Sequence, residues 1–147
     1  MAAYGPEDFL RDFDVSRETL AALEAYAALL VKWNRRINLV GRETLDDLWR
    51  RHFLDSAQLL PLLPPLPEGR PRVSADLGSG AGFPGLVLAI LGAGEVHLIE
   101  SDRKKCAFLR EAARASGARV EIHPLRIEAV EGLTAEVVTA RALAPLD

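Results

Sequence analysis

The stretch ADLGSGAGFPG at residues 75–85 constrains the fold more than any other part of the sequence, because four of its eleven residues are glycine. An apolar, strand-like run (residues 72–77) leads into it, and an apolar, helix-like run (residues 84–94) follows. A strand that turns through glycines into a helix is typical of α/β proteins, in which the bare backbone lies close to a bound nucleoside.

The remainder of this half alternates in the same way. Strand-like runs at 95–100, 118–123 and 135–140 follow the first one, and a second helical pattern covers 103–117 up to Gly117. Strands that alternate with helices indicate βαβ units and a parallel sheet with helices on both faces. We therefore predict an α/β fold, a Rossmann-like sandwich.

Two helices and a proline-rich stretch precede this pattern. An apolar stripe from Leu20 to Ile37 predicts a helix capped by Ser16. A second helix is expected to begin at a capping box of Thr44 and Asp47, and to run to Pro61, the first of five prolines in residues 61–71. We predict a helical extension with its linker over 1–66, and the first four strands of a Rossmann-like region over 67–147.

Composition narrows the class of protein. Apolar residues make up 49% of the 147-residue chain, and the formal net charge is −3, which argues against a generally basic nucleic-acid binder. A single cysteine excludes an internal disulfide and a cysteine-based zinc site. The acidic start MAAYGPEDFLRDF is unlike a signal peptide, and the sequence has no long apolar run. We expect a soluble, cytoplasmic protein, a monomer, with no membrane contact and no metal.

The glycine loop can be aligned in two ways. Residues 80–85 read as GxGxxG, the dinucleotide motif, whereas Asp76, Gly78 and Gly80 fit the loop of S-adenosylmethionine (SAM) enzymes. The residue that would accept hydrogen bonds from a ribose, Glu100, suits both cofactors. If the dinucleotide motif starts at Gly80, polar residues occupy the positions where its strand should run. If the motif starts at Gly78, Phe83 occupies the position of its third glycine. SAM is therefore favoured, with Asp76 expected near the cationic methionyl end.

At this point the chain resembles a known family. ADLGSGAGFPGL, LIESDRKKCAFLRE and TARALAPL, with KWNRRINLVG and RHFLDS before them, are similar to the ribosomal RNA small subunit methyltransferase G family, also called glucose-inhibited division protein B. The resemblance runs from about Leu20 to Leu146. It implies SAM as the cofactor, methylation of N7 of one guanosine in 16S rRNA of the small ribosomal subunit, and a sheet that continues beyond Asp147, so that this chain is a truncated member.

The resemblance also assigns site residues. Gly78 and Phe83 correspond to contacts of the SAM loop, and Glu100 to the acid that binds the ribose. Ile127 and Glu128 correspond to the pair that holds the adenine, and Arg141 to an arginine near the cofactor and the guanine. The lone pair of guanine N7 lies in the ring plane and carries no proton, so the reaction needs no general base. We expect Arg141 to orient the guanine or the SAM carboxylate.

Two other functions remain open: an NAD(P)-binding oxidoreductase, and a non-catalytic nucleotide-binding fragment. One group of cationic residues can be interpreted in two ways, as a basic surface for rRNA phosphates or as an ordinary solvated helix face, and the sequence favours neither. The group consists of Lys32, Arg35, Arg36, Arg42, Arg50, Arg51, Arg103, Lys104 and Lys105.

Several other side chains are interpreted as structural. His52 is expected to be packed or to cap a helix, and Asp55 to pair with Arg51 one turn away. Trp33, Trp49 and Cys106 are expected in the core, and His97 in a strand without a second ligand beside it.

Overall fold

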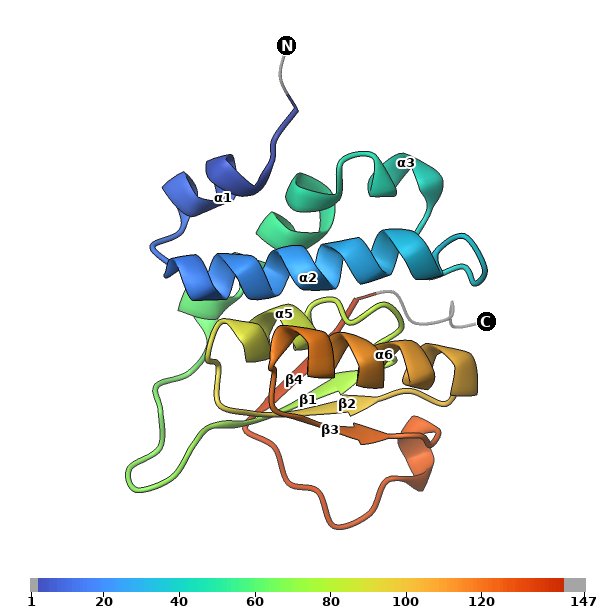
Figure 1. Ribbon diagram of the computed structural model, residues 1–147. Coiled ribbons are helices and arrows are strands. Elements are labelled where there is room, and N and C mark those ends of the chain that lie inside the picture. The colour runs from blue at the N-terminus through green and yellow to red at the C-terminus, as the bar shows by residue number, and fades with distance from the viewer. Residues whose placement is uncertain (1–2, 142–147) are drawn as a thin grey trace.

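A computed structural model describes residues 3–141 (Figure 1). Its sheet has four parallel strands in the order β3-β2-β1-β4, and these comprise β1 (Val73–Leu77), β2 (Glu95–Ile99), β3 (Val120–His123) and β4 (Val137–Ala140). All four lie within the ranges that the sequence predicts. Because the four strands are parallel, their carboxyl ends lie at one edge of the sheet. The chain crosses to either side of β1, and α/β proteins bind their ligands at the carboxyl edge where the strand order reverses in this way.

The helices lie above one face of the sheet in Figure 1. The crossover helices α5 (Gly85–Ile90) and α6 (Arg103–Ser116) pack on the strands, and α2 (Arg17–Trp33) packs on α6. The expectation of helices on both faces is wrong for residues 3–141, since the crossover between β3 and β4 is an irregular loop with one short 3-10 helix, η3 (Ile127–Ala129). A loop of this kind cannot cover the second face as a helix would.

The core lies between the sheet and these helices. Val96 and Leu98 point from β2 into it, where they meet Phe108 of α6 and Tyr26 of α2, all of them at most 2% exposed. Side chains alternate along a strand, so His97, which lies between Val96 and Leu98, points to the opposite face. Trp33 and Trp49 pack at the edge of this core, and Cys106 is fully buried, as expected.

The first two N-terminal helices are α1 (Pro6–Asp12) and α2. Ser16 caps α2 as predicted, and its hydroxyl accepts the Thr19 N–H at 3.0 Å. The helix ends at Trp33, so Ile37 lies beyond it in the following turn. Buried side chains of α2 join the same core as those of the sheet. The division of the chain at residue 66 stays a prediction.

The second predicted helix is broken into pieces. The structure has α3 (Arg42–Leu45), a π-helix η1 (Trp49–Leu54), α4 (Asp55–Ala57) and a 3-10 helix η2 (Leu60–Leu62). The predicted capping box is wrong: Thr44 lies inside α3, and its hydroxyl donates to the Gly41 carbonyl instead of accepting a backbone N–H. The apolar stripe did not show that two polar residues, His52 and Ser56, also lie on the buried face.

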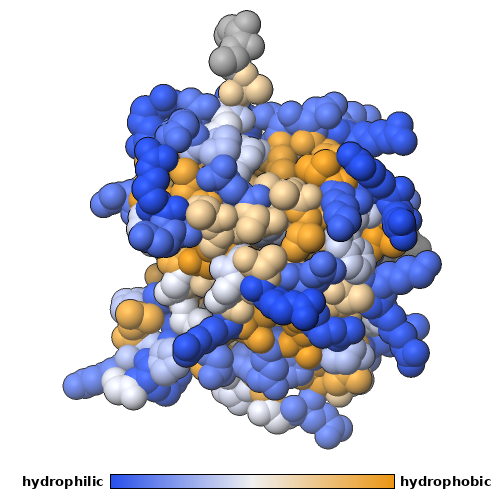
Figure 2. Space-filling view, viewed as in Figure 1, coloured by the Kyte–Doolittle hydropathy of each residue, from blue (hydrophilic) through white to orange (hydrophobic). Residues whose placement is uncertain are grey.

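The surface of the molecule carries some exposed hydrophobic residues. Figure 2 shows hydrophobic residues exposed between the N-terminal helices, with hydrophilic residues around them. None of the helices within residues 3–141 combines the length and apolarity needed to cross a membrane.

Candidate functional site

A groove of about 530 Å³ opens at the carboxyl end of β1. The glycine loop and Glu100 lie on one side of it, and the turn after α2 lies on the other. Its lining residues are Leu39, Val40, Gly41, Thr44, His52, Gly78, Ser79, Gly80, Ala81, Phe83, Glu100, Lys105 and Arg141. Five of the eight residues predicted as the site therefore line one groove: Gly78, Gly80, Phe83, Glu100 and Arg141.

The glycine loop needs its glycines for backbone reasons. Gly78, Gly80 and Gly82 have φ values of 67°, 54° and 98°, which side chains of L residues disfavour. The loop is held by α2, because the buried Tyr26 hydroxyl donates to the Ala81 carbonyl. A Cβ on Gly82 would meet that hydroxyl at 2.5 Å. The loop is thus fixed by a residue 55 positions earlier in the chain.

Gly85 lets α5 approach the sheet closely. A Cβ at this position would lie 2.6 Å from both Asp76 Oδ2 and Leu98 Cδ2. The third glycine of GxGxxG fills this packing role in dinucleotide sites, and Gly85 does the same here. The spacing is therefore meaningful for packing, although it does not identify the ligand.

Asp76 is not among the residues that line the groove. Only 1% of it is exposed, and Asp76 Oδ1 accepts the Thr139 hydroxyl at 2.7 Å, while Oδ2 accepts the Gly85 N–H at 3.3 Å. Burial raises the pKa of this carboxyl above its ordinary value. The side chain joins β1, β4 and α5 beneath the loop, so its expected contact with the methionyl end stays a prediction.

Glu100 faces the groove from the end of β2. One oxygen accepts the Gly80 N–H at 2.8 Å, and the other accepts the Asp102 N–H at 2.9 Å. A carboxylate has about four acceptor positions, so two remain for hydroxyl groups of a ligand. The two amide contacts also fix the side chain relative to the glycine loop before any ligand binds.

Arg141 lies on the opposite wall, where it contacts the N-terminal helices. Its Nη2 donates to the Arg51 carbonyl at 2.6 Å and to Asp55 Oδ2 at 3.0 Å. The predicted pairing of Asp55 with Arg51 is therefore wrong, because the carboxylate bonds to an arginine 86 residues away. The guanidinium also lies over the Phe83 ring, 5.6 Å from its centroid.

His52 contacts both Phe83 and Arg141, and it also lines the groove. Its ring stacks on Phe83 with centroids 4.7 Å apart, and its Nδ1 is 2.8 Å from Arg141 Nη1. Burial, followed by the charges of Arg141 and Arg51, lowers the pKa of His52 from 6.5 to about 4, so the ring is neutral at pH 7.

The contact with Arg141 also decides which ring nitrogen of His52 carries the proton. A guanidinium can only donate, so Nδ1 accepts and the proton lies on Nε2. Within residues 3–141 that buried Nε2 has no hydrogen-bond partner. A buried donor without a hydrogen-bond partner lowers the stability of the folded state.

The turn that closes the groove is ordered by Asn34. Its side-chain oxygen accepts the N–H groups of Leu39 at 2.9 Å and Val40 at 3.0 Å. Sequence reasoning missed the roles of Asn34, Tyr26 and Thr139 as well as that of His52. The KWN and RHFLDS segments were the available signals, although nothing in the sequence shows what such residues contact.

Two predicted residues lie elsewhere. Ile127 and Glu128 are in η3 after β3, both exposed, and neither lines the groove. Their expected contact with an adenine stays a prediction. The prediction for His97 is wrong, because His123 Nε2 lies 2.9 Å from its Nδ1 and Glu121 is also close.

Some of the predicted cations gather beside the groove. Lys32 at the end of α2, with Arg35 and Arg36 in the turn that follows, shares a hollow with Lys104 of α6. Lys105 lines the groove itself. Arg50 lies apart from this hollow, stacked over the Tyr4 ring with its guanidinium 5.4 Å from the centroid. The structure therefore gathers four of the nine predicted cations into one patch.

Comparison with known proteins identifies the family of this chain. Residues 19–147 match the family model described as rRNA small subunit methyltransferase G. A protein named ribosomal RNA small subunit methyltransferase G from Rhodospirillum rubrum is 65% identical over 141 residues, which are 96% of this chain and 68% of that protein. One from Rhodospirillum centenum is 65% identical over 139 residues, 95% of this chain and 62% of that protein.

A likeness in fold alone extends to a solved structure. It is a mutant of MtNAS in complex with S-adenosylmethionine, with a TM-score of 0.54 and 15% identity, and the match covers 97% of this chain and 59% of that one. The chain spans about two thirds of the length of the curated relatives it matches. The family match and the identities together show that this chain belongs to the rRNA small subunit methyltransferase G family.

Proposed function

We propose that this chain carries the SAM-binding part of an enzyme that methylates N7 of a guanosine in 16S rRNA of the small ribosomal subunit. The observation that carries the proposal is the groove in which the glycine loop, Glu100 and Arg141 meet. Family membership supports the methyltransferase over an NAD(P)-dependent oxidoreductase.

The side chains in the groove suit the parts of SAM. Glu100 keeps acceptor positions for the ribose hydroxyls. Arg141 uses three of its five N–H groups on His52, Arg51 and Asp55, which leaves two for a carboxylate or a guanine edge. The glycine loop leaves the bottom of the groove without side chains at Gly80, where the nearest atom to an added Cβ is 3.8 Å away.

SAM supplies an electrophilic methyl group on a sulfonium. The in-plane lone pair of guanine N7 attacks it, and no proton has to be removed. The protein therefore contributes position rather than acid–base catalysis. Arg141 is held by three contacts and so keeps a fixed orientation, and one of these contacts is with neutral His52. Neither group has to change its protonation state.

Calorimetry with SAM and with NAD⁺ tests the cofactor, and tritium transfer from labelled SAM to undermethylated 30S particles tests the reaction. We expect SAM binding, no NAD⁺ binding, and label in 7-methylguanosine after nuclease digestion. Binding without transfer would make this chain a nucleotide-binding fragment, and NAD⁺ binding would support the oxidoreductase.

Variants of the groove connect the function to these residues. We expect E100Q to weaken SAM binding about tenfold and R141A to reduce transfer more than SAM binding if Arg141 orients the guanine. An exposed residue at the far end of the sheet provides the control, R119Q. Unchanged binding and transfer in R141A would contradict the role of Arg141.

The hollow beside the groove is proposed as the surface that contacts rRNA phosphates. Lys32, Arg35 and Arg36 are exposed there, on a protein whose formal net charge is −3. The double variant R35Q/R36Q should weaken binding to 30S particles and lower the slope of log K against log salt concentration by about 2. An unchanged slope would show that these arginines form only a solvated helix end.

A further inference from the structure

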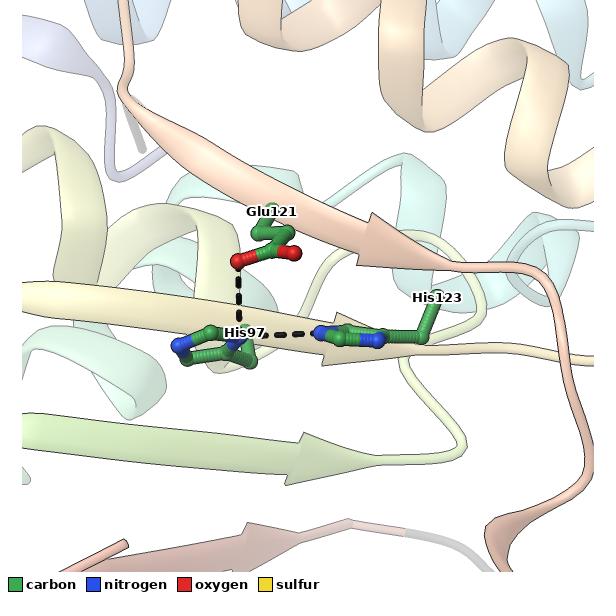
Figure 3. A group of neighbouring side chains, drawn as sticks. All are labelled: His97, Glu121 and His123. Carbon is green, nitrogen blue, oxygen red and sulfur yellow. Dashed lines mark hydrogen bonds and ion pairs between the residues drawn. The ribbon is translucent and has the colours of Figure 1, made fainter. Parts of the chain in front are cut away.

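Three metal-ligating side chains come together on the face of the sheet that points away from the helices. Figure 3 shows His97 on β2 with Glu121 and His123 of β3 turned toward it. The neighbours of His97 along the strand, Val96 and Leu98, point into the core, so His97 belongs to the opposite face. The cluster is separate from the cofactor groove, since none of its members lines it.

Strand pairing explains why the three meet. β2 and β3 run parallel, with His97 opposite Glu121 and Ile99 opposite His123. Glu121 and His123 are two residues apart and share a face, so both side chains reach the ring of His97. His97 Nδ1 lies 2.9 Å from His123 Nε2 and 3.4 Å from Glu121 Oε2.

A fourth side chain fixes the ring of His97. Its other nitrogen, Nε2, is 2.8 Å from Glu95 Oε2. A carboxylate can only accept when it is ionised, so the Nε2 proton points at Glu95 and the lone pair of Nδ1 points at Glu121 and His123. Metal-binding histidines almost always donate their second ring N–H to an oxygen in this way.

His97 Nδ1 therefore has two neighbours that could share a cation with it, His123 Nε2 and Glu121 Oε2. The two carboxylates give the cluster a charge of −2 when both imidazoles are neutral. Only 6% of the His97 side chain is exposed, whereas 67% of the Glu121 side chain is, so the site is rigid on one side and adjustable on the other.

We propose that His97, Glu121 and His123 bind a divalent late first-row metal ion, with Zn²⁺ as the best match. Two imidazoles and a carboxylate, with a water as the fourth ligand, form a usual tetrahedral Zn²⁺ set. Bonds of about 2.05 Å at tetrahedral angles put ligand atoms about 3.3 Å apart. The separations of 2.9 and 3.4 Å from His97 Nδ1 are close to this value.

The remaining pair needs a small adjustment. The three ligand atoms lie within 4.8 Å of one another, and the exposed Glu121 side chain can close the gap by rotation. The ion would join β3 to β2 on the face of the sheet that points away from the helices. The proposed metal therefore serves the stability of the sheet and takes no part in methyl transfer.

The experiment measures Zn²⁺ binding to metal-free protein, without an affinity tag, against a chromophoric chelator. We expect one Zn²⁺ per chain, an at least tenfold weaker affinity in H123Q and a smaller loss in E121Q. Two variants away from the cluster should keep the affinity: H52Q, which removes another histidine, and E68Q, which removes another exposed acid. Both test variants change residues that are not fully buried, so they are expected to fold.

Co²⁺ gives a second readout that does not depend on activity. We expect the intense visible absorption of tetrahedral Co²⁺, lost in H123Q, and a rise in Tm of the wild type with Zn²⁺ that H123Q does not show. Equal Zn²⁺ affinity in the wild type and H123Q would overturn the proposal, and so would an absence of binding at 100-fold excess Zn²⁺. The cluster would then be a hydrogen-bonded histidine pair that shares a proton.

Discussion

Replacing Gly85 with alanine should destabilise the protein, although the change favours helix formation. Gly85 is the first residue of α5, and the Cβ of an alanine there would lie 2.6 Å from Asp76 Oδ2 and 2.6 Å from Leu98 Cδ2. Ordinary van der Waals contact begins at about 3.5 Å, so these neighbours must retreat by about 0.9 Å. The affected atoms belong to Asp76 and Leu98, which are at most 1% exposed and cannot move freely.

The magnitude is the balance of three contributions. Overpacking of a tight core costs about 1–3 kcal/mol. Displacement of Asp76 weakens its hydrogen bonds with Thr139 and Gly85, which adds about 1 kcal/mol. The gain in helix propensity is at most about 1 kcal/mol. We therefore expect G85A to lower the free energy of unfolding by about 1–3 kcal/mol, and to weaken SAM binding because Asp76 supports the glycine loop.

Urea denaturation of the wild type and G85A measures this difference, with an unchanged slope m as the sign that only stability has changed. The matched control is G5A, another glycine at the start of a helix, where the nearest atom to an added Cβ is 4.0 Å away. That variant should lose less than about 1 kcal/mol. The reasoning is refuted if G85A is as stable as the wild type or more stable, because propensity would then outweigh the close approach.

Two further predictions concern the groove. Y26F should lower the free energy of unfolding by about 1–2 kcal/mol in urea and weaken SAM binding, because the buried Ala81 carbonyl loses its donor; an unchanged transition would show that the hydroxyl is dispensable. Folding lowers the pKa of His52 from 6.5 to about 4. Between these two pH values the unfolded state binds a proton that the folded state does not, so the free energy of unfolding decreases as the pH falls from about 6.5 to 4. The full shift corresponds to about 3 kcal/mol, and because the groove admits water we expect about half of it. H52Q removes this titration, so the wild type should lose about 1.5 kcal/mol more than H52Q between pH 7 and pH 4; parallel pH profiles would contradict it. The raised pKa of Asp76 has the opposite effect on the pH dependence of stability. Both proteins contain Asp76, so its contribution cancels in the difference between them.

The local sequence was sufficient to predict those elements whose conformation depends mainly on their own residues. All four strands and the helix 103–117 were predicted to within two residues, because apolar alternation and glycines such as Gly94 and Gly117 at some of the boundaries are local signals. The glycine loop and Glu100 were found for the same reason, since a βα turn contains its own requirements. The burial of His52 and Ser56 was not predicted, because these residues are polar and only the packed structure shows them buried. The break in the second helix was not predicted either.

The sequence alone thus determined the α/β class, the edge of the sheet at which the candidate site lies and, through resemblance, the family. Tertiary structure decided which side chains meet. Arg141 contacts His52 and Asp55 across more than 80 residues, and strand pairing brings His97 to His123. Such contacts depend on how distant elements pack, and a propensity or a spacing describes only neighbours along the chain. For that reason Asp76, predicted from its position in a motif, lies under the loop as a packed and hydrogen-bonded carboxyl.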